Sequence, residues 1–267
     1  MMKNRFLFVA MLFAALSLGF ASCDMENGNN PDDPQGEQTE QNGSTENNGG
    51  EETPEPADPY NGHAYVDLGL PSGLKWATCN VGATKPEEYG NYYAWGEVEP
   101  KSTYSWSTYK FMDSSVNDWN GLNRYTIADG QTDGVWYDSE GNFIGDNKTT
   151  LDKEDDAATV NMGGSWRMPT KAEQDELRTE CSWTWTTLNG VNGYNVEGPN
   201  GNSIFLPAAG CRFDSDLDGA GSGGDYWSSS LNTSYSGGAY GLNFGSDGVD
   251  WNGSYRYYGP SVRGVIE

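Results

Sequence analysis

The chain has 267 residues, of which 39 are Asp or Glu and 15 are Lys or Arg, giving a formal net charge of -24 at pH 7. This acidic balance excludes nucleic acid as a partner, because phosphate backbones are bound by clustered Lys and Arg. The sequence contains one histidine, His63. A serine or cysteine nucleophile would have that residue as its single candidate base, and we expect the protein not to be an enzyme.

The first 22 residues have the pattern of a signal peptide. Lys3 and Arg5 precede the apolar run 6–20, and two small residues come directly before Cys23. Because this apolar run is too short to span a bilayer, residues 1–22 are predicted to be cleaved. The position of Cys23 resembles a bacterial lipobox, which implies lipidation of its thiol and an outer membrane lipoprotein held by the lipid anchor only. A signal peptide with an incidental cysteine is the alternative.

The segment 23–58 is rich in Asp, Glu, Asn and Gly and contains no Lys or Arg. Its apolar surface is too small to offset the entropy lost on ordering, and its like charges repel one another. We therefore predict an acidic disordered stalk that holds a folded domain away from the membrane. Asp24 and Glu26 resemble a surface-export signal, which implies exposure at the cell surface.

Residues 59–267 are predicted to form one α+β domain with short antiparallel strands, one or two short helices and long loops. Turn-forming residues separate short apolar or alternating segments, as in small sheets. The expected strands are 63–70, 74–79, 203–206, 240–244, 249–251 and 262–266. Asp247 and Gly248 between two alternating segments predict a hairpin. Residues 113–156 lack periodicity and are expected to be a long surface excursion.

Two helices are expected in this domain. Thr170 and Glu173 form a capping box, which predicts a helix over 170–181 with Leu177 on its buried face. A shorter helix is expected over 86–89, ended by Gly90. These helices would pack against the strands.

An oxygen-rich loop gives a candidate calcium site. Four aspartates with a glycine among them follow the spacing of an EF-hand loop, and their hard carboxylate oxygens suit Ca²⁺. The candidate ligands are Asp214, Asp216, Asp218 and Asp225. The alternative interpretation is a solvated Asp/Gly loop without an ion.

The segment from Tyr226 to Tyr258 is dominated by Tyr, Ser, Gly and Asn. This composition is typical of antibody-like recognition surfaces, where Tyr supplies rigid contact area and small polar residues supply hydrogen bonds. Alternation along the predicted strands assigns several large residues to the core instead. These are Trp227, Tyr240, Leu242, Phe244 and Trp251.

Eight separate blocks of the sequence carry a family resemblance. They are residues 63–73, 76–83, 92–97, 154–158, 164–170, 206–210, 226–230 and 261–265. Together these blocks resemble the Fibrobacter succinogenes major paralogous domain of surface lipoproteins. Residues 166–173 are also similar to a block of formylglycine-generating enzymes, which implies a C-type lectin-like fold.

The same resemblance bears on the cysteines. Formylglycine-generating enzymes hold reactive cysteines late in the domain, and Cys79, Cys181 and Cys211 lie elsewhere, so that oxidation chemistry is not expected. Three cysteines in an exported domain allow one disulfide and one thiol. We favour a Cys79–Cys181 pair, although the sequence leaves the connectivity open.

In C-type lectin-like folds the late loops and strands form the ligand face, and the resemblance implies the same here. The expected binding residues are Asn232, Tyr235, Asn243, Asp247, Asp250, Asn252, Tyr255, Tyr257 and Tyr258. Some proteins of this fold are diversified by retroelement mutagenesis, which would produce such residues. We expect a non-catalytic binding module for an extracellular protein or glycan. A structural or fimbria-like component of the cell envelope is the alternative.

Overall fold

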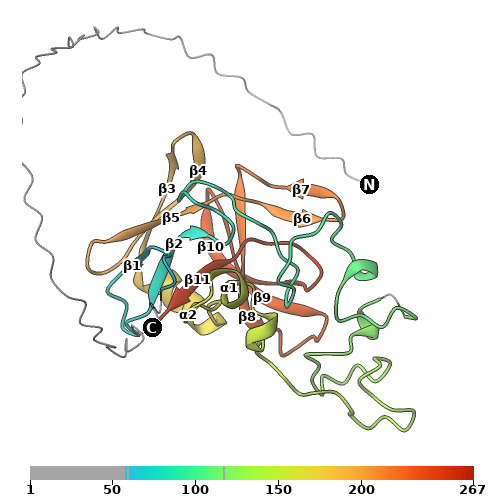
Figure 1. The fold of residues 1–267 in the computed structure, drawn as a ribbon. Helices are drawn as coiled ribbons and strands as arrows, with labels where there is room; N and C mark the ends of the chain where they lie inside the picture. The colour runs from blue at the N-terminus through green and yellow to red at the C-terminus, as the bar shows by residue number, and fades with distance from the viewer. Residues whose placement is uncertain (1–57, 59, 117) are drawn as a thin grey trace, which may run out of the picture. The chain divides into compact units, whose positions relative to one another are not determined.

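The computed structural model describes residues 58, 60–116 and 118–267 (Figure 1). These residues belong to one compact unit of the chain, Pro54–Glu267. The predicted signal peptide, the lipidation site Cys23 and nearly all of the predicted stalk lie outside the described residues.

Eleven short strands form most of the regular structure of the described chain, and all strand pairs are antiparallel. Three sheets have the strand orders β1-β2-β11, β3-β4-β5 and β10-β9-β8, and β6 and β7 form a fourth pair. The strands are β1 (Tyr65–Asp67), β2 (Lys75–Asn80), β3 (Ser182–Leu188), β4 (Val191–Glu197), β5 (Ser203–Pro207), β6 (Cys211–Phe213), β7 (Asp216–Asp218), β8 (Gly223–Leu231), β9 (Gly238–Gly245), β10 (Gly248–Tyr255) and β11 (Arg263–Ile266).

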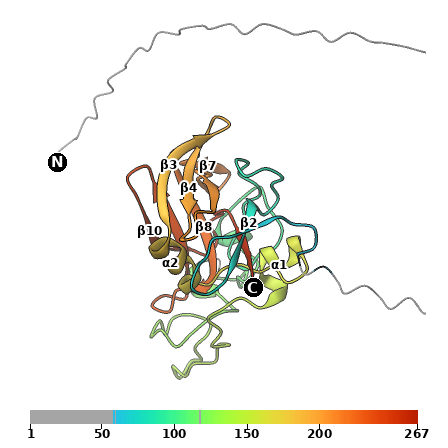
Figure 2. The same cartoon turned by 90° about the vertical axis from the view of Figure 1, so that its left-hand side faces the viewer.

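Two α-helices accompany the sheets in the described chain, α1 (Ala157–Met162) and α2 (Lys171–Glu180). Few helices among small antiparallel sheets confirm the predicted α+β class. Helix α2 packs against β8, β9 and β10 (Figure 2). The 3₁₀ turns are η1 (Trp106–Thr108), η2 (Trp119–Gly121) and η3 (Lys153–Asp155).

The capping box that predicted α2 is present. The Thr170 hydroxyl accepts a hydrogen bond from the Glu173 amide at 3.3 Å, and Glu173 accepts one from the Thr170 amide at 2.7 Å. The predicted helix at 86–89 is wrong, because Glu88 uses its carboxylate to close a turn on Thr84 instead. Helix α1 was not predicted, and it begins at Asp156, whose side chain accepts from the Thr159 amide.

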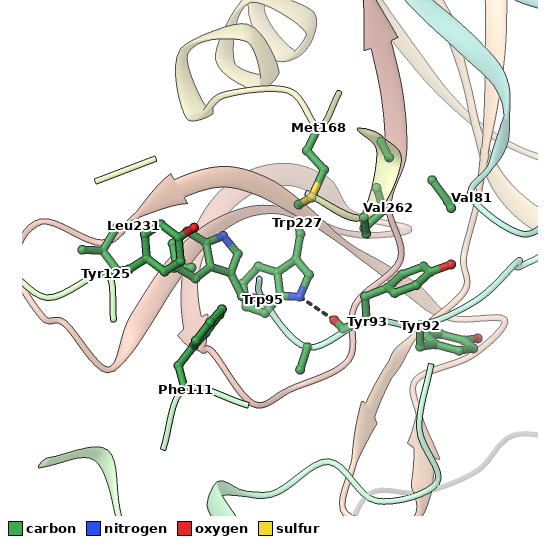
Figure 3. Packing of buried hydrophobic residues seen from close by; sticks show 14 of the residues in the cluster. Val81, Tyr92, Tyr93, Trp95, Phe111, Tyr125, Met168, Trp227, Leu231 and Val262 are labelled. Atoms are coloured by element: carbon green, nitrogen blue, oxygen red, sulfur yellow. Dashed lines mark hydrogen bonds between the residues drawn. The ribbon is translucent and has the colours of Figure 1, made fainter. Parts of the chain in front are cut away.

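Aromatic side chains fill the larger of two apolar cores. Trp95 and Trp227 are fully buried and lie side by side in Figure 3. The Trp227 indole donates to the Tyr93 carbonyl at 2.8 Å, and the Trp95 indole donates to the Ser228 carbonyl at 2.8 Å. Both of these indole N–H groups therefore have a partner, which removes the cost of burying them unpaired.

The second core lies between the β3-β4-β5 sheet and the β10-β9-β8 sheet. Phe244 meets Tyr194 edge to face at 5.3 Å between ring centroids and stacks on Tyr226 at 5.8 Å. Leu242 is buried beside them, as the alternation predicted. Trp251 follows the same alternation but is 41 % exposed, so its assignment to the core is wrong. Strand β10 is the edge of its sheet, and it contacts the core through Val249, whereas Trp251 stays partly exposed.

Residues 113–156 form the expected excursion, drawn in green to yellow-green in Figure 1. The described residues of this segment contain no named α-helix or β-strand, although Leu122, Tyr125 and Trp136 are buried. These three side chains attach the excursion to the larger core.

Candidate functional site

The nine predicted binding residues divide between the two ends of the β9–β10 hairpin. Asn243, Asp247 and Asp250 lie near its turn, where Gly245 pairs with Gly248. The remaining six gather at the opposite end, where Tyr255 pairs with Gly238. They are Asn232, Tyr235, Asn252, Tyr255, Tyr257 and Tyr258. Strand pairing therefore separates one predicted set into two groups.

A cavity of about 370 Å³ opens at the second end of the hairpin. We call it the tyrosine hollow. Its lining is made by Tyr235, Gly238, Asn252, Gly253, Ser254, Tyr255 and Tyr258. The volume lies within the usual range of small-ligand pockets. Four of the nine predicted residues line it directly.

Two loops bring the tyrosines together. The β8–β9 connection turns tightly, with the Asn232 amide donating to the Gly238 carbonyl at 3.0 Å, and this turn carries Tyr235. Gly237 stands beside that ring, and a Cβ built on it would lie 2.4 Å from the ring. The chain after β10 turns where the Tyr258 amide donates to the Tyr255 carbonyl at 3.0 Å. Both turns are short, so the aromatic side chains have little freedom to separate.

The tyrosine rings meet at defined angles. The Tyr255 ring is 6.1 Å from Tyr235 and inclined to it by 73°, and it is 5.7 Å from Tyr258 and inclined by 85°. Tyr257 instead lies parallel to Tyr255, at 5.8 Å and 13°. Edge-to-face and offset parallel pairs are both favourable for aromatic rings. Tyr255 is nevertheless 44 % exposed, so part of this cluster faces solvent.

Two tryptophans from distant parts of the sequence support the rings. Trp106 lies 4.7 Å from Tyr257, and Trp119 lies 5.8 Å from Tyr235. Neither tryptophan is among the predicted binding residues. Each is a tryptophan within a polar loop, and this signal could have identified them. The sequence of such a long loop does not indicate where each tryptophan packs.

Arg256 connects the two loops from inside the domain. It is fully buried and lies in the chain between the exposed Tyr255 and the half-buried Tyr257. Its guanidinium donates to the carbonyls of Arg124 at 3.0 Å and Tyr125 at 3.2 Å. The complete set of acceptors also includes the Ser236 carbonyl and the Tyr109 hydroxyl. The guanidinium has no carboxylate among these partners, so its role is to hold backbone segments in place.

The lining of the tyrosine hollow carries no ionisable acid or base other than tyrosine. Burial, followed by the neighbouring Tyr255, Asp118 and Asp129, raises the pKa of Tyr235 to about 12. Burial also raises the pKa of Tyr257. These hydroxyl groups therefore stay protonated at neutral pH, and the hollow is lined by neutral groups near two carboxylates.

The group near the hairpin turn has a different character. Asn243 donates to the Asp225 carboxylate at 2.7 Å, and burial raises the pKa of Asp225. Asp247 and Asp250 are exposed. The side chain of Asp250 accepts from the Trp251 amide at 2.8 Å. We assign no cavity to this group.

The predicted calcium ligands are distributed over two hairpins. Asp214 lies in the β6–β7 turn with a φ of 48°, Asp216 and Asp218 lie at the two ends of β7, and Asp225 lies on β8. An extended strand separates alternate side chains by about 7 Å, whereas an EF-hand loop wraps them around the ion. Within the described residues, these four are not among the acidic groups whose oxygens lie within 4.8 Å of one another.

An acidic cluster of that kind forms elsewhere, from Asp152, Glu154 and Asp155. Arg124 reaches all three carboxylates, at 2.6, 3.2 and 3.1 Å respectively. Lys148 pairs with Asp152 as well, and hydrogen bonds from Lys148 and then Arg124 lower the pKa of Asp152. Lys and Arg side chains of the same chain thus balance the negative charge of this cluster.

The three described cysteines are free thiols, so the favoured Cys79–Cys181 disulfide is wrong. Cys79 lies on β2, whereas Cys181 is the C-cap residue of α2. Burial raises the pKa of Cys181 to about 11 and also raises that of Cys211. These two thiols are therefore protonated, and weak nucleophiles, at neutral pH.

Another cavity, of about 580 Å³, opens beside the 166–168 segment. Lys153 and Arg167 both line it, and the two terminal nitrogens of Arg167 bind the Glu173 carboxylate at 2.7 Å. His63 lies nearby, with its ring 6.2 Å from Trp166 in an edge-on arrangement. Trp166 is the one aromatic residue in the lining of this cavity, whereas three tyrosines line the tyrosine hollow.

Comparison with family models, with curated proteins and with solved structures finds no significant match. None of the helices in the described part of the chain has the length and apolar character of a membrane-spanning segment.

Proposed function

We propose that the folded part of the chain is a non-catalytic binding module for an extracellular protein or glycan, with the tyrosine hollow as its binding site. One observation carries the proposal: a cavity on the C-terminal hairpin is lined by Tyr235, Tyr255 and Tyr258 and leaves Tyr255 44 % exposed. Exposed aromatic rings held in place lose little entropy on contact with a partner.

The chemistry of the hollow supports binding without catalysis. General acid–base catalysis needs a group that titrates near the working pH and reaches the reacting atom. The hollow is lined by Tyr, Asn, Ser and Gly, and the pKa of Tyr235 is raised to about 12 by burial first. Neutral groups of this kind can orient a ligand through hydrogen bonds and ring contacts.

We further propose that the chain belongs to the major paralogous domain family, that its domain is C-type lectin-like, and that it is anchored to the outer membrane through Cys23. The α+β class with small antiparallel sheets is compatible with this fold. A surface location would place the hollow in contact with extracellular partners. Metabolic labelling with a radioactive fatty acid tests the anchor, since a Cys23→Ala chain would then carry no label.

The ligand can be sought with the full chain, made as Cys23→Ala to avoid lipid. A glycan array and a pull-down from extracellular protein would together sample both ligand classes. Capture that is lost in Tyr255→Ala/Tyr257→Ala and retained in Trp251→Ala supports the proposal. Capture that is unchanged in both variants contradicts this placement of the site. A structural envelope component would instead be recovered from crosslinked cells in a complex of fixed stoichiometry.

A further inference from the structure

Several Lys and Arg side chains of the described domain lie over aromatic rings of the same chain. Lys171 lies 3.9 Å from the Trp251 ring centroid, and Arg256 lies 5.0 Å from that of Trp95. Within the described chain, no Lys or Arg lies over Tyr235, Tyr255 or Tyr258. The tyrosine hollow is therefore an aromatic cluster without a cation of its own.

The surrounding charge favours a cation. Asp118 begins the η2 turn, and Asp129 accepts a hydrogen bond from the Ser236 amide at 3.1 Å, next to Tyr235. Both carboxylates contribute to raising the pKa of Tyr235, so their field reaches the hollow. The chain as a whole has a net charge of -24. An anionic ligand would be repelled at this place, whereas a cationic one would be attracted.

The ring geometry favours a cationic ligand over a neutral sugar. A sugar ring stacks on a flat open aromatic face. Here Tyr255 is inclined by 73° to Tyr235 and by 85° to Tyr258, so the three rings that line the hollow are turned in different directions and form no flat platform. The parallel Tyr257 lies against Tyr255 at 5.8 Å. Rings that surround a point are the arrangement that binds ammonium and guanidinium groups.

We propose that the tyrosine hollow receives a Lys or Arg side chain from a partner protein. The proposal rests on the proposed function, since it names the ligand class of the same site. The rings of Tyr235, Tyr255 and Tyr258 contact the cationic group, and the carboxylates of Asp118 and Asp129 stabilise its charge from a distance. Asn252 and Ser254, which also line the hollow, supply hydrogen bonds to the partner's backbone.

The test is a ¹H–¹⁵N chemical-shift titration of the full Cys23→Ala chain with short capped peptides. Four peptides differ only at the central residue, which is Lys, Arg, norleucine or citrulline, and tetramethylammonium serves as the minimal probe. A neutral hexose oligosaccharide is titrated in parallel. We expect the Lys or Arg peptide and tetramethylammonium to shift the amides of Gly253, Ser254 and Tyr255. Norleucine and citrulline should bind about tenfold more weakly, because the cation–π attraction is removed.

Variants localise the effect. Tyr255→Leu should weaken binding of the cationic peptide about tenfold, whereas Tyr255→Phe, which keeps the ring, should stay within about threefold. Trp251→Leu is the matched control, because Trp251 lies on the same strand with similar exposure and already has Lys171 over its ring. Near-ultraviolet circular dichroism confirms that each variant is folded.

Two results overturn the inference. One is equal binding of the norleucine and Lys peptides, and the other is binding of the neutral oligosaccharide in the hollow without any response to cations. If cations cause no shift while Tyr255→Leu still abolishes capture in the pull-down, the hollow is a binding site and only the cation assignment is wrong. If capture is also insensitive to Tyr255→Leu, the proposed function fails as well.

Discussion

Arg256 donates a hydrogen bond from Nη1 to the carbonyl oxygen of Ser236 at 3.2 Å, deep inside the domain. This bond joins the loop that carries Tyr235 to the segment that carries Tyr255 and Tyr257. The two halves of the tyrosine hollow therefore share one buried support. A side chain far from solvent determines how the exposed rings are placed.

Replacing Arg256 with Met should destabilise the domain strongly. The variant leaves the carbonyls of Arg124, Tyr125 and Ser236 without their donor in a buried place. Each unpaired buried polar group costs about 1–3 kcal/mol, so we expect the free energy of unfolding to fall by at least about 3 kcal/mol. Urea denaturation measures this directly. Arg178→Met, which removes an exposed pair with Asp175, should cost less than about 1 kcal/mol.

Gly237→Ala should disturb the hollow without removing any of its side chains. A Cβ on Gly237 would lie 2.4 Å from the Tyr235 ring, which has to move away. We expect ligand capture to weaken and stability to fall by about 1–2 kcal/mol. Gly248→Ala is the matched control on the same hairpin, because a Cβ there has no atom within 4 Å. Equal ligand capture and equal stability of the two variants would show that the position of Tyr235 does not affect binding.

Strand β10 protects its own edge. The Trp251 amide donates to the Asp250 side chain and the Gly253 amide to the Asn252 side chain, both at 2.8 Å. Asp250→Ala frees one of these donors on an edge strand and removes a charge, so we expect increased self-association in sedimentation velocity. Asp250→Asn keeps an acceptor and loses only the charge. If it associates as strongly as Asp250→Ala, hydrogen-bond capping of the edge is not the reason.

The domain should lose stability at alkaline pH. Burial raises the pKa of Tyr226 to about 12 from a usual value of 10.0. Burial is also the largest of the causes that raise the pKa of Tyr235 to about 12. Because these pKa values are raised in the folded state, their contribution is complete below pH 10 and is lost as pH rises towards about 12. Tyr226 alone accounts for roughly 3 kcal/mol over that interval. Tyrosinate absorbance should rise together with loss of near-ultraviolet circular dichroism; ionisation of all tyrosines in an intact fold would contradict this.

Local sequence signals predicted the local parts of the fold. The Thr170–Glu173 capping box identified α2, and the alternation around Asp247 identified the β9–β10 hairpin. Both depend on residues close together in the chain. The predicted 86–89 helix is wrong because the Glu88 carboxylate closes a turn on Thr84. Helix propensity does not predict such a side-chain hydrogen bond.

Burial and long-range contacts could not be predicted in the same way. Alternation placed Trp251 on the correct face of its strand, but it cannot tell that β10 is an edge strand on which this side chain stays partly exposed. A buried arginine with carbonyl partners, such as Arg256, looks like any surface arginine in the sequence. The docking of Trp106 onto Tyr257 joins segments separated by most of the domain. The binding residues were therefore predicted as a set, and tertiary packing decided which of them meet.

The central claim is that the tyrosine hollow binds the ligand. The most direct measurement is the dissociation constant of the captured ligand for the unchanged chain, for Tyr255→Ala/Tyr257→Ala and for Trp251→Ala. We predict about thirtyfold weaker binding for the double tyrosine variant, which corresponds to a 2 kcal/mol hot spot, and less than about threefold for Trp251→Ala. Equal dissociation constants for the unchanged chain and the double tyrosine variant, with both folded, would contradict the claim.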